Sequence, residues 1–252
     1  MTREWTSKLE RRRVRMPHAL FALVPVIAAA SPAAALATTN GGQAAPSGSV
    51  AAAPQVRPVV RPSGPENPAF RLAAPPTSFV GSKVRVTGLV RRGARRVVRV
   101  QYRTLGGSWS QAAAVRAARD GSFAMVWTPK SAGAYELRAA ARGAGTRTRM
   151  SGVRSISIFK AQTATWYGPG FYGKTTACGV MLTETTLGVA HRSLPCGTPV
   201  FVSYGARGVV VPVIDRGPYT KSAQWDLTGA TAQAIGVTQT SRIGVIVGTP
   251  TW

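Results

Sequence analysis

Three side chains near the end of the chain have the chemistry for proton transfer. Asp215 ends an apolar run and precedes Arg216, Asp226 stands just before a short helical pattern, and His191 is one of only two histidines in 252 residues. Burial at a strand end raises the pKa of a carboxyl, and a nearby guanidinium lowers it. Because both effects can act at Asp215 and shifted pKa values mark catalytic groups, Asp215 is a candidate general acid or base. A histidine can orient a carboxylate or share its proton near neutral pH.

Each of these residues also has a structural interpretation. Asp215 can close the turn at Gly217-Pro218 through hydrogen bonds to the backbone. Asp226 can interact with the N-terminus of the helix that follows it, and His191 can bond a carbonyl of its own loop. The residue types alone leave both readings open.

The elements that must position these residues are short. Residues 161–252 contain strand-like runs at Thr163–Tyr167, Leu187–His191, Val200–Tyr204, Gly208–Ile214 and Ile243–Val247. One helix is predicted at Gly229–Ile235, with Thr228 as its N-cap and Gly236 as its C-cap residue. Short strands with a single helix favour a compact β-barrel.

Five sequence blocks carry a specific resemblance. They are Ala164-Thr165-Trp166-Tyr167-Gly168, Thr176-Ala177-Cys178-Gly179, Val189-Ala190-His191-Arg192-Ser193-Leu194-Pro195-Cys196-Gly197-Thr198, Val213-Ile214-Asp215-Arg216-Gly217-Pro218-Tyr219 and Trp225-Asp226-Leu227-Thr228. In this order and spacing they resemble the double-psi β-barrel of the rare lipoprotein A family, a fold shared with expansins and family-45 endoglucanases. The resemblance implies a six-stranded double-psi β-barrel with one short helix over residues 161–252.

The same resemblance implies an activity on peptidoglycan. Members of the family are typically lytic transglycosylases, which cleave between N-acetylmuramic acid and N-acetylglucosamine and leave a 1,6-anhydro end. That reaction needs one carboxyl group as acid and then base, a role we assign to Asp215. The family also places a functional histidine at His191, and Asp226 matches the acid of the endoglucanase and expansin barrels. We expect no cofactor and no metal.

Four further residues are predicted to bind the glycan. Thr165 and Tyr167 share one face of their strand because side chains alternate with period two. Tyr219 and Trp225 can stack on sugar rings or serve only as packing. One departure from the family matters, since Val180 stands where several transglycosylases carry an acid. This departure keeps open an alternative function, a non-catalytic, expansin-like protein that binds and loosens the wall.

Two cysteines are present, Cys178 and Cys196. In an exported protein an even pair most simply forms one disulfide. The bridge would close a segment of 19 residues, which stabilises a fold by roughly 3 kcal/mol in the chain-entropy model.

The first 76 residues indicate export and a tether. A basic stretch, an apolar run from Ala19 to Ala30 and the small-residue site Ala35-Leu36-Ala37 predict a signal peptide over residues 1–37. Residues 38–76 are rich in Ala and Pro and predict a disordered linker. We therefore expect a secreted or cell-wall protein without stable membrane insertion after cleavage.

Residues 77–160 alternate polar and apolar positions between turn signals, which predicts an immunoglobulin-like β-sandwich with Trp109 and Trp127 in its core. Residues 78–160 hold 17 Lys or Arg residues against two acids. Such a basic face suits anionic cell-wall polymers. It lacks a recognition helix and interleaved aromatics, so we expect no nucleic acid. An Arg-rich composition alone would give the same face.

Overall fold

The computed structural model describes residues 56–58, 67–92, 95–142 and 147–248. The predicted signal peptide and most of the predicted linker lie outside these ranges. Nearly all regular structure in the described ranges is β-strand, as the sequence predicts. Among these residues no helix has the length and the apolar character needed to cross a bilayer.

The first half of the described chain forms two sheets. One contains β2 (Phe70–Ala73), β4 (Val84–Val90) and β7 (Ser122–Trp127), in the order β2-β4-β7. The other contains β3 (Thr77–Phe79), β5 (Val97–Thr104), β6 (Ser110–Arg116), β8 (Gly133–Arg142), β9 (Thr148–Met150) and the beginning of β10 (Arg154–Tyr167). Side chains from both sheets share one apolar core. The immunoglobulin-like topology remains a prediction.

Two expectations for this half are wrong. The ordered structure begins before residue 77, because Phe70 is fully buried in the core as part of β2. Trp109 is not in the core; its ring lies between the guanidinium groups of Arg103 and Arg138, at 4.5 and 4.0 Å from its centre. Trp127 is buried, as predicted.

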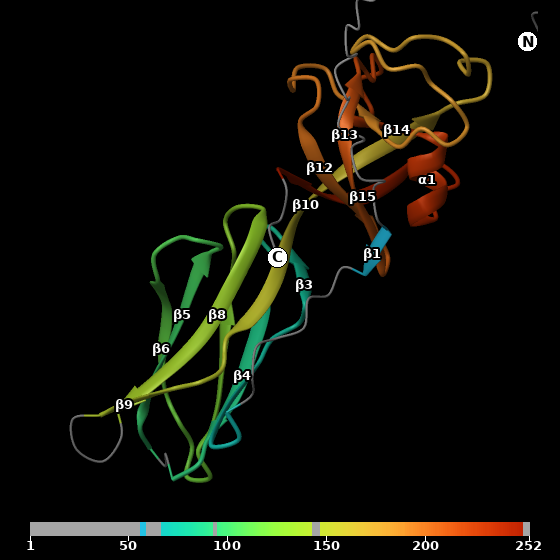
Figure 1. The fold of residues 1–252 in the computed structure, drawn as a ribbon. Helices are drawn as coiled ribbons and strands as arrows, with labels where there is room; N and C mark the ends of the chain where they lie inside the picture. Colours follow the sequence, from blue (N-terminus) through green and yellow to red (C-terminus); the bar gives the residue numbers. More distant parts are fainter. Residues whose placement is uncertain (1–55, 59–66, 93–94, 143–146, 249–252) are drawn as a thin grey trace, which may run out of the picture. The chain divides into compact units, whose positions relative to one another are not determined.

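The second half is a closed barrel of six strands (Figure 1). Its strands are the end of β10, β11 (Val189–Ala190), β12 (Pro199–Tyr204), β13 (Arg207–Asp215), β14 (Trp225–Thr228) and β15 (Ser241–Val247). The pairs β10–β14 and β11–β13 are parallel, and the other four pairs are antiparallel. β1 (Val56–Pro58) adds to β13 from outside the ring. The predicted six-stranded barrel is confirmed.

Strand β10 belongs to both halves. Its early residues pair with β3 and β8, and its later residues pair with β15 and β14. The domain boundary predicted between residues 160 and 161 therefore falls inside a continuous strand.

A register shift in the barrel decides where Asp215 lies. Val189 of β11 pairs with Val213 of β13, but the next residue, Ala190, pairs with Asp215, so Ile214 is an extra residue on β13. Val213 and Val189 belong to the barrel core. Regular alternation would place Asp215 on the core side with Val213, and the bulge turns it to the other side.

Helix α1 (Gly229–Ile235) has the predicted bounds and caps. Thr228 accepts a hydrogen bond from the backbone N–H of Thr231 on its side-chain oxygen, and Gly236 takes the left-handed conformation that ends the helix. The Thr228 hydroxyl also accepts the backbone N–H of Gly188, so one buried side chain ties the helix to the loop before β11.

We predict that Thr228→Ala lowers the free energy of unfolding by about 1 kcal/mol, because the helix loses its cap. The Gly188 amide keeps the Thr231 hydroxyl as an acceptor at 2.9 Å. Urea denaturation followed by circular dichroism measures the loss. Thr240→Ala, at an exposed position after the helix, is the matched control and should change stability by less than about 0.5 kcal/mol. Equal stability of the two variants would contradict the role of Thr228.

Candidate functional site

Four residues on adjacent barrel strands form one transverse row. Thr165 of β10 pairs with Asp226 of β14, Asp226 pairs with Ala190 of β11, and Ala190 pairs with Asp215 of β13. Residues paired across neighbouring strands point to the same face of a sheet. Strand spacing then places the two aspartates about 10 Å apart at their α-carbons, with a methyl side chain between them.

The Asp215 carboxylate is held by backbone amides. Its Oδ1 atom accepts the N–H of Ala177 at 2.9 Å and that of Arg216 at 2.8 Å. Charged hydrogen bonds of this kind stabilise an ionised carboxylate. The carboxylate is half-buried and is not sealed inside the turn.

Asp226 has a different environment. It is half-buried and accepts a hydrogen bond from the Thr165 hydroxyl at 2.8 Å. Burial raises the pKa of the Asp226 carboxyl above its ordinary value, the Thr165 hydrogen bond opposes this effect, and the negative charge of Asp215 adds to it. The two aspartates are therefore electrostatically coupled.

The Tyr167 hydroxyl reaches the same face of the sheet. It is buried and makes no hydrogen bond of normal geometry with any described residue. Burial raises the pKa of Tyr167, and the nearby carboxylates of Asp215 and Asp226 raise it further. The hydroxyl thus stays protonated and can donate a hydrogen bond to an oxygen that enters the site.

His191 lies beside the row and makes structural contacts. Its Nδ1 atom accepts the backbone N–H groups of Ser193 and Leu194 at 3.3 and 3.1 Å, so the ring carries its proton on Nε2. Burial lowers the pKa of His191, and the positive charges of Arg192 and Arg216 lower it further. The ring is neutral at pH 7 and packs against Trp225 with 4.5 Å between ring centres. Its catalytic role remains a prediction.

Two arginines shape the loops around the site: Arg192, which the sequence does not single out, and Arg216, which the sequence places beside Asp215. Arg192 donates hydrogen bonds to the carbonyls of Pro218, Thr220 and Ala223, which fixes the loop after Asp215. Arg216 donates to the His191 carbonyl and to Cys196 Sγ. Nothing in their spacing distinguishes them from surface arginines, because their acceptors are carbonyls brought together only by the fold.

The predicted disulfide is confirmed. Cys178 and Cys196 are bonded, with 5.7 Å between their α-carbons. The bridge joins the loop that carries Ala177 to the loop after His191. It therefore holds the amide that binds Asp215.

The structure places three of the four predicted glycan-binding residues in the site or at the surface and buries the fourth. Thr165 and Tyr167 lie in the site as described above. Tyr219 is 85% exposed and available for contact with a ligand. The stacking role predicted for Trp225 is wrong, because the side chain is only 1% exposed and its indole N–H donates to Gln162 inside the fold.

The acid missing at Val180 has no replacement in this loop. Val180 is 37% exposed, and Glu184 is exposed without a hydrogen bond or ion pair to the rest of the described chain. Within the described ranges, no three His, Cys, Asp or Glu side chains come together as a group that could hold a metal ion.

Comparison with known proteins agrees with this geometry. A family model described as lytic transglycolase, of the double-psi β-barrel type, matches residues 160–247. The probable endolytic peptidoglycan transglycosylase RlpA of Synechocystis is 45% identical over 85 residues, which are 33% of this chain and 26% of that protein. Its namesake in Aquifex aeolicus is 38% identical over 89 residues, 34% of this chain and 39% of that protein.

The endolytic peptidoglycan transglycosylase RlpA of Campylobacter jejuni is 40% identical over 74 residues, 29% of this chain and 27% of that protein. The chain thus covers well under half the length of each of these relatives. The fold and the row of carboxyls define a double-psi β-barrel with a candidate acid–base site. Residues 160–247 match the double-psi β-barrel family model and are similar to the barrel of the rare lipoprotein A-like proteins.

We predict that Asp215→Asn lowers the pKa of the Asp226 carboxyl, because the variant removes a negative charge that raises it. Titration of ¹³C-labelled carboxyl groups by NMR measures the shift. Glu184→Gln removes an equal charge from an exposed loop and should leave the Asp226 titration unchanged. An identical titration in Asp215→Asn and the parent protein would show that the two carboxyls are not coupled.

We also predict that the double variant Cys178→Ser/Cys196→Ser loses about 3 kcal/mol of stability against urea, since the unfolded chain regains the freedom of a closed loop. The parent protein kept in reductant should show the same loss. A loss below about 1 kcal/mol in both would mean that the bridge does not constrain this part of the barrel.

Proposed function

We propose that this protein is a peptidoglycan lytic transglycosylase whose barrel cleaves the glycan strand between N-acetylmuramic acid and N-acetylglucosamine. The observation that carries the proposal is the row in which Asp226 and Asp215 flank Ala190. The printed names of the relatives, which describe endolytic peptidoglycan transglycosylases, support the same reaction.

The two carboxyls divide the chemistry according to their surroundings. Asp226, whose pKa is raised, is the better proton donor. Asp215, which accepts two amide N–H groups, is the better ionised partner. This assignment differs from the single acid–base role predicted for Asp215, and it follows the general rule that unlike environments assign acid and base in a carboxyl pair.

The reaction balances without water. Asp226 gives its proton to the glycosidic oxygen while the bond from that oxygen to the anomeric carbon breaks. The negative charge of Asp215 stabilises the positive charge that develops on the sugar. The sugar's own 6-hydroxyl then bonds to the anomeric carbon, its proton passes to a carboxylate, and a 1,6-anhydro end results.

The remaining residues of the row have supporting roles. The methyl side chain of Ala190 leaves space between the carboxyls. Thr165 orients Asp226, and the Tyr167 hydroxyl, which lies close to the Asp215 carboxylate, can donate a hydrogen bond to that carboxylate or to the substrate. His191 holds its loop through the two hydrogen bonds that Nδ1 accepts. Because its pKa is lowered, the ring stays neutral near pH 7 and does not take up a proton in the reaction.

A protein with this activity works outside the cytoplasm. We propose accordingly that residues 1–37 are an export signal followed by an Ala- and Pro-rich linker. The linker predicted over residues 38–76 is interrupted by β1, which pairs with β13, and by β2. The location then is the cell wall or the medium.

Digestion of purified sacculi, followed by mass spectrometry of the muropeptides, tests the reaction. We predict that the parent protein generates 1,6-anhydro ends and that Asp226→Asn lowers their rate of formation at least about 100-fold, because the proton donor is lost. Glu184→Gln is the matched control and should keep full activity.

The pH profile separates the two aspartates. We predict that kcat/KM of the parent protein falls as the pH rises through the raised pKa of Asp226, because the donor loses its proton. In Asp215→Asn this fall should occur at lower pH, because the charge that helps to raise the pKa of Asp226 is removed. Tight binding to sacculi without any new anhydro ends would overturn the proposal and establish the expansin-like alternative. Full activity of Asp226→Asn would instead refute its role as donor.

A further inference from the structure

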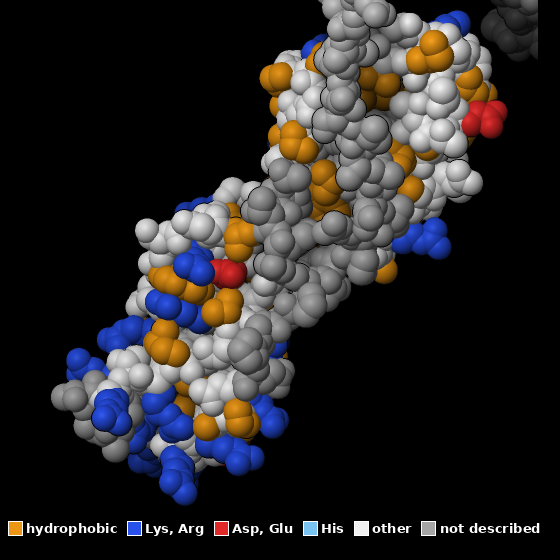
Figure 2. All heavy atoms as spheres, in the orientation of Figure 1, with side chains coloured by type: hydrophobic (Ala, Val, Ile, Leu, Met, Phe, Trp, Pro, Cys, Tyr) orange, Lys and Arg blue, Asp and Glu red, His pale blue; other side chains and the backbone are white. Residues whose placement is uncertain are grey.

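Positive charge is concentrated in the first half of the described chain. Residues 67–159 contain 17 Lys or Arg residues and two acids, a net charge of +15, whereas residues 160–248 contain seven and three, a net charge of +4. In Figure 2 the blue side chains crowd the surface of the first half and are sparse over the barrel strands.

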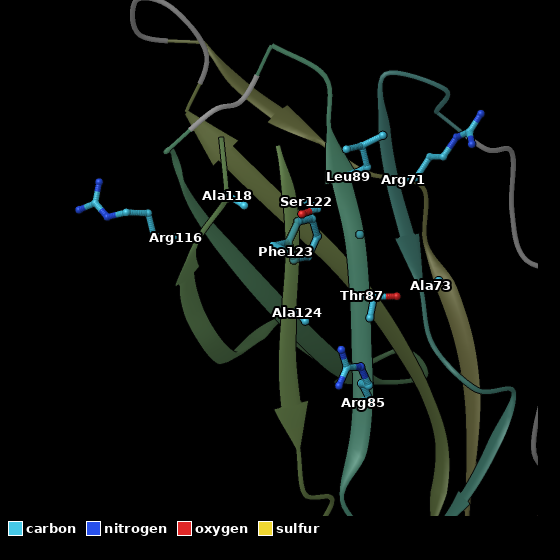
Figure 3. A pocket seen from close by; sticks show the side chains of 11 residues that line it. Arg71, Ala73, Arg85, Thr87, Leu89, Arg116, Ala118, Ser122, Phe123 and Ala124 are labelled. Atoms are coloured by element: carbon cyan, nitrogen blue, oxygen red, sulfur yellow. The ribbon is translucent and has the colours of Figure 1, made fainter. Parts of the chain in front are cut away.

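An open hollow lies on the outer face of the sheet β2-β4-β7 and has a volume of about 610 Å³ (Figure 3). Its floor is a transverse row of small side chains, since Ala73 pairs with Thr87 and Thr87 pairs with Ala124. Small side chains in one row leave the sheet surface recessed.

Arginines stand on both sides of this floor. Arg71 of β2 pairs with Leu89 of β4, which is two residues after Thr87. Arg85 is on β4 itself, two residues before Thr87. Four residues of strand separate the two rows, so the α-carbons of Arg71 and Arg85 are about 14 Å apart along the strand direction. Figure 3 shows that Arg71, Arg85 and Arg116 project from separate places and do not converge on one point.

Most of this charge has no protein counter-charge. The side chains of Arg71 and Arg85 make no hydrogen bond or ion pair with another residue in the described part of the chain, and the Arg116 guanidinium donates to the neutral carbonyl of Arg95. Of the two acids in this half, Glu136 pairs with Arg103 on the other sheet. Asp120, at the edge of the hollow, accepts the amide and hydroxyl of Ser122.

We propose that this hollow binds a linear polyanion that carries phosphate groups along its backbone. Guanidinium forks and a hydroxyl such as that of Thr87 are suitable donors to phosphate oxygens. Because the arginines are spread and do not converge, an extended chain satisfies several of them and a single phosphate ion cannot.

The floor presents methyl and hydroxyl groups, and the one aromatic ring at the hollow, Phe123, is buried. The described lining of the hollow therefore offers no exposed ring on which nucleobases could stack, and the structure favours a polymer without bases.

The test measures binding of full-length protein to poly(glycerol phosphate) by fluorescence anisotropy at several salt concentrations. Arg71→Gln/Arg85→Gln should weaken binding at least about tenfold at low salt and reduce the salt slope by about two, one for each lost phosphate contact. Arg99→Gln/Arg142→Gln removes the same charge from exposed positions on the other sheet and should weaken binding less than about threefold.

Two other probes identify the ligand class. Hyaluronate, whose charges are carboxylates, and single-stranded DNA should both bind more weakly than poly(glycerol phosphate). Equal losses in the two double variants would overturn the proposal, since they would indicate general charge attraction. Tighter binding of DNA or hyaluronate would overturn it as well. The assay measures binding and not glycan cleavage, so its outcome does not depend on the proposed transglycosylase activity.

Discussion

The extra residue at Ile214 is the constraint on which the site depends. Without it, the alternation of β13 would direct the Asp215 carboxylate into a core of valines, where an unpaired charge is strongly unfavourable. The shift opposite Ala190 turns the side chain outward, where the amides of Ala177 and Arg216 meet it. Those amides are fixed in turn by the disulfide and by the turn that follows β13.

The same shift also creates the pairing between two carboxyls. Once Asp215 is aligned with Ala190, it shares a face with Asp226, which reaches that face by ordinary alternation from the core residues Trp225 and Leu227. The two carboxyls have different environments. Asp215 accepts hydrogen bonds from two backbone amides, whereas Asp226 accepts one from Thr165 and has a pKa that burial raises. Two acids of the same type therefore have different surroundings, and the surroundings of Asp226 raise its pKa, as a proton donor requires.

Local rules explain what the sequence predicts well. The bounds and caps of α1 follow from Thr228 and Gly236, and the disulfide follows from an even cysteine pair. Strand β14 is not marked by any periodic pattern, because Trp225 to Thr228 is too short to show one. The surroundings of both tryptophans depend on residues distant in sequence. Trp225 is buried against Gln162 and His191, whereas the half-buried Trp109 packs against Arg103 and Arg138. Pro212, inside the strand run, indicates an edge or a bulge, but nothing in the run locates the extra residue at Ile214.

Arg216 shows how the barrel keeps its acids available. From its position beside Asp215, the sequence suggests an ion pair that would lower the pKa of that carboxyl. The guanidinium instead donates to the His191 and Asp215 carbonyls and to Cys196 Sγ, and Arg192 is likewise occupied by carbonyls of its neighbouring loop. No ion pair joins either aspartate to a described arginine or lysine. The two cations therefore act on the loop backbone and on His191, whose pKa they lower, while Asp226 keeps the raised pKa that a proton donor needs.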